Sequence, residues 1–164
     1  MSGVPSLRIR RGHLADHLAL CELWAQVDAF HAEIRPDFFG PGADPARSRL
    51  YLDRILQDAN QELLVAVRGD AVVGLIHLQL YDTPRSPVFA ERRRAHVEDL
   101  VVEQTARRQG VGRALLRAGE DWARRNHAEQ VVLTVWRGNE GAADFYNAFG
   151  YQPVSQVLAR DLDE

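Results

Sequence analysis

The sequence predicts an α/β protein in which a mixed sheet is flanked by four helices. Apolar runs with the two-residue period of strands alternate along the chain with apolar stripes of helical period. A hairpin signal lies early in the chain, and helical segments separate the later strands, so the sheet should be antiparallel early and parallel late. At 164 residues and 46% hydrophobic composition, residues 1–164 are expected to form a single domain with a buried core.

The first half of the chain predicts one strand, two helices and a hairpin. Residues 6–12 alternate Leu7 and Ile9 with arginines, as a half-buried strand does. Asp16 is a suitable N-cap for a helix over 16–34, and a loop with three prolines and two glycines (35–45) separates it from a second helix over 46–59. Residues 62–81 form two apolar runs around Gly69 and Asp70, which predicts a β-hairpin with these two residues at its turn.

The second half predicts alternating strands and helices after a polar connection over 83–94. The expected elements are a strand over 95–103, a helix over 110–127, a strand over 130–136, a short helix over 141–150 with a glycine C-cap, and a final strand over 151–162 with Pro153 near its start. The order is therefore β-αα-ββ-β-α-β-α-β. It implies a sheet of about six to seven strands, with its parallel part around 95–103 and 130–136.

Composition excludes several classes of function. The formal net charge of −3 and the pI of about 6.1 give no electrostatic reason to bind nucleic acid or an anionic membrane. Cys21 is the only cysteine, which excludes an internal disulfide and fits a reducing compartment. His13 and His17 have no third ligand near them in the sequence, so no metal site is expected. With no signal-like apolar segment at the N-terminus and no run of roughly 18 apolar residues, we expect a soluble cytoplasmic protein.

The stretch RRQGVGRALL (107–116) is the strongest local signal of chemistry. Two glycines permit close backbone approach, and the amides of 109–113 lie at the N-terminus of the following helix, where N–H groups attract phosphate. A dinucleotide site would have a third glycine where this chain has Leu115, and a nucleoside-triphosphate loop would have a lysine, which the chain lacks. The stretch predicts a site for another diphosphate, unless the glycines only tighten the connection and the arginines are solvated.

Two spaced motifs resemble the GNAT superfamily of acetyl-CoA-dependent N-acetyltransferases. The acyl-CoA signature of that family, Arg or Gln, two residues, Gly, any residue, Gly or Ala, is met by Arg107, Arg108, Gln109, Gly110, Val111 and Gly112. The stretch NEGAADFYNAFGY (139–151) is similar to a second family element, with Asn139, Ala142, Ala143, Phe145, Tyr146, Gly150 and Tyr151. The resemblance extends in element order over 6–162, although 14–60 matches by pattern and not by motif.

The resemblance implies a site for the acetyl donor. By this similarity, the turn would bind the CoA pyrophosphate through main-chain amides of Gln109, Gly110, Val111, Gly112 and Arg113, with Arg107 and Arg108 beside them. Main-chain groups of the preceding strand would pair with the pantetheine arm at Leu100, Val101 and Val102. In the second element, Asn139 would hydrogen-bond the pantetheine, Ala143 would lie in the donor site, and the Tyr146 hydroxyl would protonate the departing thiolate. A buried core tyrosine and a helix-capping asparagine are the alternatives for Tyr146 and Asn139.

The general base is expected on the strand 95–103. Strand alternation would put Val97, Asp99 and Val101 on one side and His96, Glu98 and Leu100 on the other. The stretch EDL-V (98–101) looks like the diamine and polyamine branch of the superfamily, which implies that Glu98 deprotonates the acceptor amine, directly or through water. His96 is the reserve candidate because imidazole exchanges a proton near neutral pH. Glu98 could instead pair at the sheet edge with Arg92 or Arg93.

Together these features predict an N-acetyltransferase that moves an acetyl group from acetyl-CoA, its cosubstrate, directly to a primary amine of a small molecule or peptide, without a metal. The strands 95–103 and 130–136 would splay apart to admit the pantetheine. A cationic acceptor is suggested by the acids on the expected acceptor side, namely Glu33, Asp37, Asp82, Glu98 and Asp99. A homodimer is expected only from the family resemblance. The alternatives are a non-catalytic acyl-CoA-binding regulator and, more remotely, a nucleotide-binding module of another fold.

Overall fold

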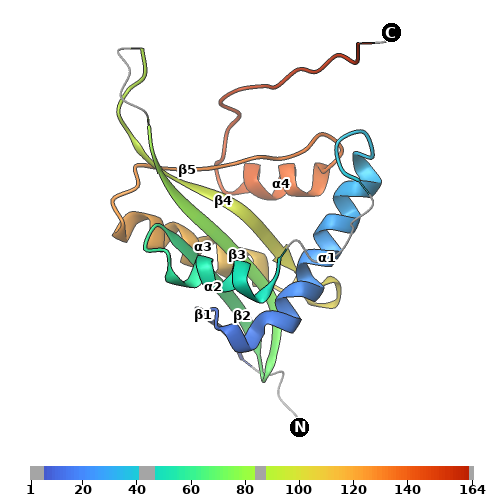
Figure 1. Cartoon of the computed structure of the whole chain (residues 1–164), viewed down its shortest axis with the longest axis vertical. Coiled ribbons are helices and arrows are strands. Elements are labelled where there is room, and N and C mark those ends of the chain that lie inside the picture. Colours follow the sequence, from blue (N-terminus) through green and yellow to red (C-terminus); the bar gives the residue numbers. More distant parts are fainter. Residues whose placement is uncertain (1–5, 41–46, 84–87, 163–164) are drawn as a thin grey trace. The chain divides into compact units, whose positions relative to one another are not determined.

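The computed structural model describes residues 6–40, 47–83 and 88–162 (Figure 1). The elements are β1 (Leu7–Arg11), the 3₁₀ turn η1 (Leu14–Asp16), α1 (His17–Ile34), α2 (Arg49–Gln57), β2 (Gln61–Arg68), β3 (Ala71–Asp82), β4 (Arg93–Val102), the 3₁₀ turn η2 (Gln104–Ala106), α3 (Val111–Arg125), β5 (Gln130–Leu133) and α4 (Glu140–Ala148). Parts of the predicted 35–45 loop, the 46–59 helix and the 83–94 connection lie outside the described residues.

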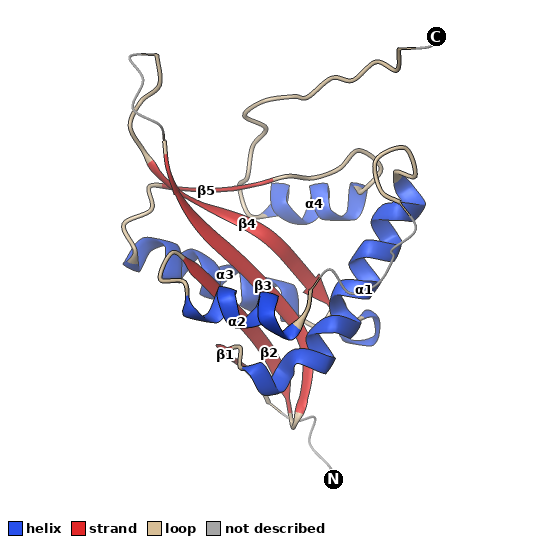
Figure 2. Cartoon of the chain, in the orientation of Figure 1, coloured by secondary structure: helices blue, strands red, loops and turns tan. Residues whose placement is uncertain are grey.

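The chain forms two compact parts, Met1–Thr134 and Val135–Glu164. The first part contains a five-stranded sheet in the order β1-β2-β3-β4-β5, and the long strands β3 and β4 lie side by side at its centre (Figure 2). The first four strands pair antiparallel, and β4 and β5 pair parallel. The predicted mixed sheet and four helices are therefore confirmed, with five strands in place of six or seven. The single domain stays a prediction.

Local sequence signals explain several element boundaries. The β2–β3 hairpin turns at Gly69 and Asp70 as predicted, and Gly69 has a φ of 62°, which favours glycine. The Ser48 hydroxyl caps α2 by accepting a hydrogen bond from the amide of Tyr51 at 3.2 Å. Asp16 precedes α1 as predicted, but its carboxylate accepts from the amide of His13 at 2.8 Å. It therefore caps η1 and not α1.

Helices cover both faces of the sheet in the first part (Figure 1). On one face, buried side chains of α1 and α2, including Trp24 and Leu52, pack with side chains of the sheet such as Leu75 and Val101. On the other face α3 approaches β3 so closely that a Cβ added at Gly119 would lie 2.9 Å from Ile76. Such packing excludes water from both faces and accounts for most of the stability of a domain of this size. In the described part of the chain, no helix is long and apolar enough to cross a membrane.

A β-bulge lies in the middle of β4. His77 pairs with Asp99, but the next residue of β3, Leu78, pairs with Val97, so Glu98 is one residue too many on β4. Because a bulge interrupts the alternation of side chains, the predicted separation of Glu98 from Asp99 onto opposite sides is wrong. The charges of both carboxylates act on the hydroxyl of Tyr51, which lies on the α1 and α2 side of the sheet.

The second part contains α4, whose end follows the prediction. Gly150 has a φ of 86°, and the amides of Gly150 and Tyr151 donate to the carbonyls of Asn147 and Tyr146 at 2.9 and 3.1 Å. These two bonds are the Schellman motif, which explains the glycine.

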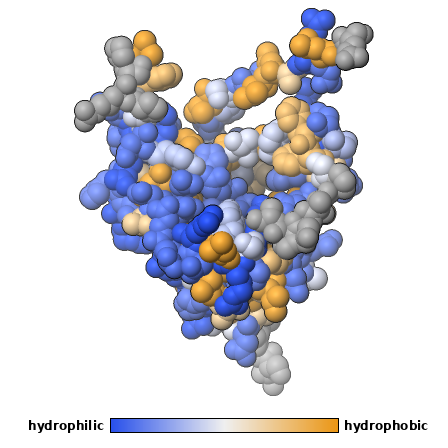
Figure 3. Space-filling model, in the orientation of Figure 1, coloured by the Kyte–Doolittle hydropathy of each residue, from blue (hydrophilic) through white to orange (hydrophobic). Residues whose placement is uncertain are grey.

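The predicted final strand over 151–162 is wrong, since these described residues form neither helix nor strand. Their pattern suits a strand, but a strand also needs a neighbouring strand for its backbone groups. Most of the surface in Figure 3 is hydrophilic, whereas this segment exposes four apolar side chains by 76 to 91%, those of Val154, Val157, Leu158 and Leu162.

Candidate functional site

The turn between β4 and α3 presents backbone N–H groups to solvent at the start of a long helix. Gly110 has a φ of 81° and is the N-cap of α3, and the first hydrogen bond inside the helix runs from the amide of Ala114 to the carbonyl of Gly110 at 3.0 Å. The amides of Gly110, Val111 and Gly112 consequently have no acceptor within the helix. They add their partial positive charges to the positive end of the helix dipole, which is where anions bind.

Side chains hold this turn in place. The Arg107 Nε donates to the carbonyl of Val102 at 3.0 Å, and the Gln109 Nε2 donates to the carbonyl of Thr105 at 2.8 Å. The Gln109 Oε1 also accepts from the guanidinium of Arg68. Arg108 has a φ of 60°, which costs a residue other than glycine about 1 kcal/mol. Arg107, Arg108 and Arg113 are exposed and place positive charge around the turn.

The strand that leads into the turn has one unpaired side. The parallel ladder with β5 joins Arg94–Val97 to Gln130–Leu133 and ends there. Farther along β4, Leu100, Val101 and Val102 pair with β3 but have no partner in β5. This stretch therefore has backbone donors and acceptors on one edge that an extended amide chain can pair with, although the carbonyl of Val102 already accepts from the Nε of Arg107. The predicted splaying of the two strands beyond this ladder stays a prediction.

In the second part of the chain, the residues predicted for the pantetheine and the departing thiolate lie at the start of α4 and along it. Asn139 caps this helix, since its Oδ1 accepts from the amide of Ala142 at 3.1 Å, and its carbonyl accepts from the amide of Ala143 at 3.1 Å. The ring of Tyr146 lies 5.2 Å from that of Phe145 and 5.6 Å from that of Tyr151. Burial raises the pKa of the Tyr146 hydroxyl well above its ordinary value. This phenol therefore keeps its proton at neutral and mildly alkaline pH.

A cluster of three polar side chains lies around the bulge of β4. The Oε1 of Glu98 accepts hydrogen bonds from the Tyr81 hydroxyl and from the Nδ1 of His96, both at 3.1 Å. The rings of Tyr81 and His96 meet edge to face, with centroids 6.2 Å apart. The hydrogen bond from His96 lowers the pKa of Glu98 most, the charge of His96 and the Tyr81 hydroxyl lower it further, and partial burial opposes them. The carboxylate is thus anionic at neutral pH.

The same bonds assign the tautomer of His96. An ionised carboxylate only accepts hydrogen bonds, so the Nδ1 of His96 carries a hydrogen and donates to Glu98. The suggested ion pair of Glu98 with Arg92 or Arg93 is not the arrangement found. The Nε of Arg93 lies 3.9 Å from Asp82, and its guanidinium contacts Asn60 at 3.4 Å.

A second cluster surrounds Asp99, on the same face of the sheet. The Oδ2 of Asp99 accepts from the Trp24 Nε1 at 3.1 Å, and its Oδ1 lies 3.5 Å from the guanidinium of Arg47. Burial alone would raise the pKa of Asp99, but the interaction with the facing ring of His77 and the charge of Arg47 outweigh it, so the pKa is lowered. The sequence named Asp99 only as one acid among several, and no motif links it to residues 24, 47 and 77.

The other predicted acids lie outside these clusters. Asp37 forms a two-bond ion pair with Arg35 at 2.6 and 2.8 Å, Asp82 is exposed, and Glu33 is exposed. Among residues 6–40, 47–83 and 88–162, no group of three or more His, Cys, Asp or Glu side chains could hold a metal ion.

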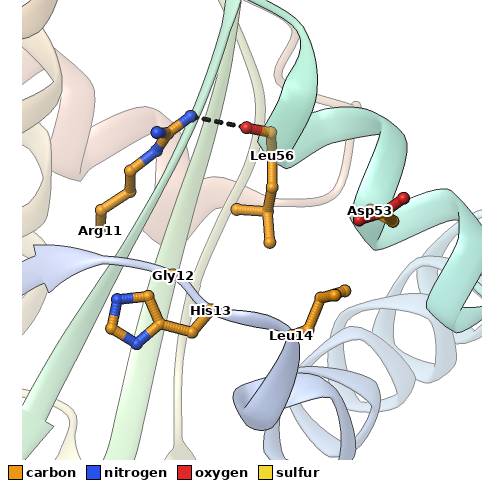
Figure 4. Close-up of a pocket in the computed structure, with 6 residues that line it drawn as sticks. All are labelled: Arg11, Gly12, His13, Leu14, Asp53 and Leu56. Carbon is orange, nitrogen blue, oxygen red and sulfur yellow. Dashed lines mark hydrogen bonds between the residues drawn. The ribbon is translucent and has the colours of Figure 1, made fainter.

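A surface hollow of about 420 Å³ lies elsewhere, between the end of β1 and α2 (Figure 4). Arg11 at its rim donates to the carbonyl of Leu56 at 2.8 Å and to Glu62 at 3.0 Å, and Asp53 accepts from Gln57 at 2.8 Å. The contacts of Arg11 hold β1 to its neighbours, and the contact of Asp53 lies within α2. The hollow therefore offers no arrangement for chemistry comparable to that on β4.

The chain is similar to several known proteins in sequence and fold. The sequence model of the Acetyltransferase (GNAT) family matches residues 27–151. The chain is 29% identical over 140 residues to an aminoglycoside N(6′)-acetyltransferase type 1 of Klebsiella aerogenes, which covers 84% of this chain and 81% of that protein. It is 32% identical over 60 residues to the uncharacterized N-acetyltransferase YobR of Bacillus subtilis (strain 168), covering 37% of this chain and only 24% of YobR. A crystal structure of a mutant of the BH1408 protein from Bacillus halodurans has the same fold, with a TM-score of 0.90 at 24% identity, covering 94% of this chain and 99% of that one.

Proposed function

The chain belongs to the acetyltransferase (GNAT) family and is an acyltransferase enzyme, and on that premise we propose that it transfers an acetyl group from acetyl-CoA directly to a primary amine of a small molecule. One observation carries the proposal. A single strand, β4, holds an anionic carboxylate at Glu98 and then continues, through an edge that β5 leaves unpaired, into a basic turn at the start of α3. The carboxylate that would receive the amine and the turn that would bind the diphosphate thus lie at the two ends of the unpaired edge, with Glu98 on β4 and Gly110 at the start of α3.

The donor end of β4 fits CoA chemically. Amides of Gly110, Val111 and Gly112 would donate to the pyrophosphate, and Arg108 and Arg113 would supply charge, while the edge at Leu100, Val101 and Val102 would pair with the amides of the pantetheine arm. Acetyl-CoA supplies the acetyl group as a thioester. The main-chain amide of Gln109 would join these donors and Arg107 would lie beside them, while the side chains of both residues hold the turn through the carbonyls of Val102 and Thr105.

Glu98 would receive the acceptor. Both hydrogen bonds that Glu98 accepts converge on its Oε1, which leaves its Oε2 directed to other partners. An anionic carboxylate holds an ammonium group and accepts its proton, directly or through water, so that the nitrogen gains the lone pair it needs for attack. A carboxylate of lowered pKa is a weak proton acceptor, and His96, whose Nδ1 donates to Glu98, is the reserve base.

Tyr146 would serve as the general acid. Because burial keeps its phenol protonated, this group can donate a proton to the sulfur that leaves when the acetyl group is transferred. The proton count then balances, since the amine loses one proton to the Glu98 side and the sulfur gains one from Tyr146. Asn139 and Ala143 would border the donor site at the start of α4, where Asn139 also caps the helix.

The experiment that separates an enzyme from a non-catalytic acyl-CoA-binding regulator is Tyr146→Phe, with Tyr151→Phe as the matched control. We expect kcat to fall about 100-fold in Tyr146→Phe, in the usual range for a lost general acid, while the Kd for CoA measured by calorimetry changes less than about twofold. Tyr151→Phe should stay near wild type in both quantities. Equal kcat values in the two variants would remove Tyr146 from the chemistry.

The acceptor class is proposed from the charges of the site. The Klebsiella aerogenes relative is an aminoglycoside N(6′)-acetyltransferase, and aminoglycosides, like polyamines, carry several ammonium groups. The carboxylates of Glu98 and Asp99 on the α1 and α2 side of the sheet suit such cations. Aminoglycosides and polyamines are therefore the acceptor classes to assay first.

We also propose a homodimer with a cytoplasmic location. The four exposed apolar side chains within 151–162 support a partner, because such residues on one segment mark an interaction surface. A second copy of the chain would cover them, and Val157→Asp should shift the mass found by analytical ultracentrifugation from dimer to monomer. A wild-type monomer at micromolar concentration would contradict the dimer. The single cysteine fits the reducing compartment that the cytoplasm provides.

A further inference from the structure

The guanidinium of Arg47 lies in a cradle made of two carboxylates and an aromatic ring, which we call the cation cradle (Asp28, Asp99 and Trp24). Arg47 donates to Asp28 at 2.6 Å and lies 3.5 Å from the Oδ1 of Asp99. Its Cζ is 5.2 Å from the centroid of the Trp24 ring. Ionised carboxylates and the face of an indole are the groups that proteins use to bind organic cations.

The cradle is built from rigid elements. Trp24 and Asp28 are four residues apart on α1, which puts them on the same side of that helix, and Asp99 lies on β4 next to the bulge. The Nε1 of Trp24 donates to the Oδ2 of Asp99 at 3.1 Å and orients both groups. Arg47, in contrast, reaches the cradle from a position just before the N-cap of α2. Arg47 therefore belongs to neither of the two elements that form the cradle.

A second observation points to a ligand beside Asp99. His77 is only 2% exposed, and its Nδ1 has no hydrogen-bond partner, while the nearest oxygen of Asp99 is 3.9 Å away. The other ring nitrogen, Nε2, has a partner, because it lies 2.8 Å from the Oε1 of Gln61. The Nε2 of the same Gln61 side chain donates to Asp58 at 2.8 Å, which fixes the orientation of the amide. The Nε2 of His77 is therefore a donor to Gln61, whereas the buried Nδ1 faces the cradle carboxylate of Asp99 without a hydrogen bond. Such a buried nitrogen is costly unless a partner reaches it.

The cradle is continuous with the proposed acetylation site. Asp99 follows Glu98 directly in the sequence, and the bulge brings both carboxylates close enough to act on the hydroxyl of Tyr51. The ring of Tyr51 meets that of Trp24 edge to face at 6.1 Å. An acceptor whose reactive amine binds at Glu98 would thus bring a neighbouring part of the same molecule to the cradle.

We propose that the cation cradle is the subsite for a second cationic group of the acceptor, and that Arg47 occupies it as an internal substitute which the acceptor displaces. This inference rests on the proposed function and narrows it. The acceptor carries at least two positive charges, one on the amine that is acetylated and one that replaces the guanidinium of Arg47. Arg47 then also selects against acceptors with one charge, since these cannot replace the ion pairs that Arg47 gives up when it leaves.

The test uses two probes of equal chain length, agmatine, which has an amine and a guanidinium, and butylamine, which has only the amine. Their binding to the full chain is measured by calorimetry without acetyl-CoA. The variants Arg47→Ala and Arg47→Gln each remove the competing cation, so each should bind agmatine at least about fivefold more tightly. The variant Asp28→Asn removes a cradle carboxylate and should bind agmatine about tenfold more weakly. Butylamine binding should change less than twofold in all three variants. Circular dichroism melts confirm that each variant is folded.

Matched controls come from an ion pair of the same kind on α3. Arg124 and Asp121 are 2.7 Å apart and exposed, so Arg124→Ala and Asp121→Asn should leave agmatine binding within twofold of wild type. Weaker or unchanged agmatine binding in both Arg47 variants would overturn the proposal, as would equal changes for the two probes. Acetylation of amines with no preference for second charges would also overturn it while leaving the proposed function intact. If agmatine binding depended on the cradle but no amine were acetylated, the proposed cation subsite would stand and the proposed acetyl transfer would be contradicted.

Discussion

The two ends of β4 offer different kinds of chemical groups, backbone groups at one end and side chains at the other. At the proposed donor end, backbone groups would bind CoA, through the unpaired edge at 100–102 and the amides that follow Gly110. At the proposed acceptor end, side chains would bind the amine, with Glu98 held by Tyr81 and His96, and with Asp99 held by Trp24. A site of backbone groups depends on local conformation, whereas a site of side chains depends on which elements meet. The donor end should therefore tolerate most side-chain changes, and the acceptor end should not.

The largest expected effect is at the acceptor end. Glu98→Gln keeps the shape and the hydrogen bond from Tyr81 but removes the negative charge that receives the amine. We expect kcat/KM for the best acceptor to fall by about 10² to 10³, in the range of a lost general base, with the Kd for CoA unchanged. Steady-state kinetics and calorimetry measure the two quantities. Glu129→Gln, an exposed acid outside the site, is the control, and an active Glu98→Gln enzyme would move the base to His96.

At the donor end, a change of backbone conformation should have the next largest effect. Gly110 has a φ of 81° with open space around its Cα, so alanine there is opposed by conformation and not by crowding. Gly110→Ala should weaken CoA binding about tenfold, since about 1 kcal/mol of strain is relieved by moving the amides. Gly141→Ala also adds a methyl group in open space, but at an ordinary φ, and should bind CoA like wild type. If removal of the Arg113 side chain weakened CoA binding more than Gly110→Ala did, side chains and not backbone groups would bind the donor.

A smaller effect is expected when the support of Glu98 is removed. Tyr81→Phe deletes one of the two hydrogen bonds on the Oε1 of Glu98 but keeps the ring against His96. The loss of one exposed hydrogen bond should lower kcat about threefold and leave KM for acetyl-CoA unchanged. Tyr51→Phe, whose hydroxyl has no hydrogen bond to Glu98, should change kcat less. The reverse order of the two variants would place the reacting amine nearer to Tyr51.

The smallest effect concerns stability at acid pH. The pKa of Asp99 in the folded chain is lowered, so this carboxylate stabilises the fold above its unfolded pKa, and the contribution is lost as pH falls through the folded pKa. The melting temperature of the wild type should thus decrease below about pH 4. Asp99→Asn should melt lower at neutral pH and lose less on acidification, whereas the exposed control Asp161→Asn should follow the wild type. Parallel curves for Asp99→Asn and wild type would show that Asp99 is not held as an anion.

Features that depend on local conformation were predicted from the sequence, whereas features that depend on contacts between elements were not. The glycine turn, the hairpin at Gly69 and the end of α4 at Gly150 depend on local conformation, and all three lie where the pattern put them. The strand over 151–162 has the right pattern but no neighbour, and no pattern within a segment reports that.

The acceptor end shows the limit most clearly. The bulge at Glu98 is a mismatch between two strands, and it puts Glu98 and Asp99 on the same side, where simple alternation would separate them. The cradle joins residues 28, 47 and 99, which come from three elements far apart in the sequence. Neither feature has a signal in any one stretch of the chain, so neither could be predicted before the elements were placed.

The most direct measurement of the central claim is the release of free CoA from acetyl-CoA in the presence of polyamines, aminoglycosides, lysine analogues, amino acids and peptides, with mass spectrometry of the acceptor. We predict that a multiply charged small-molecule amine gains one acetyl group for each CoA released, and that Glu98→Gln abolishes most of this turnover. No acetylated acceptor in any class, together with no binding of CoA by calorimetry, would contradict the account.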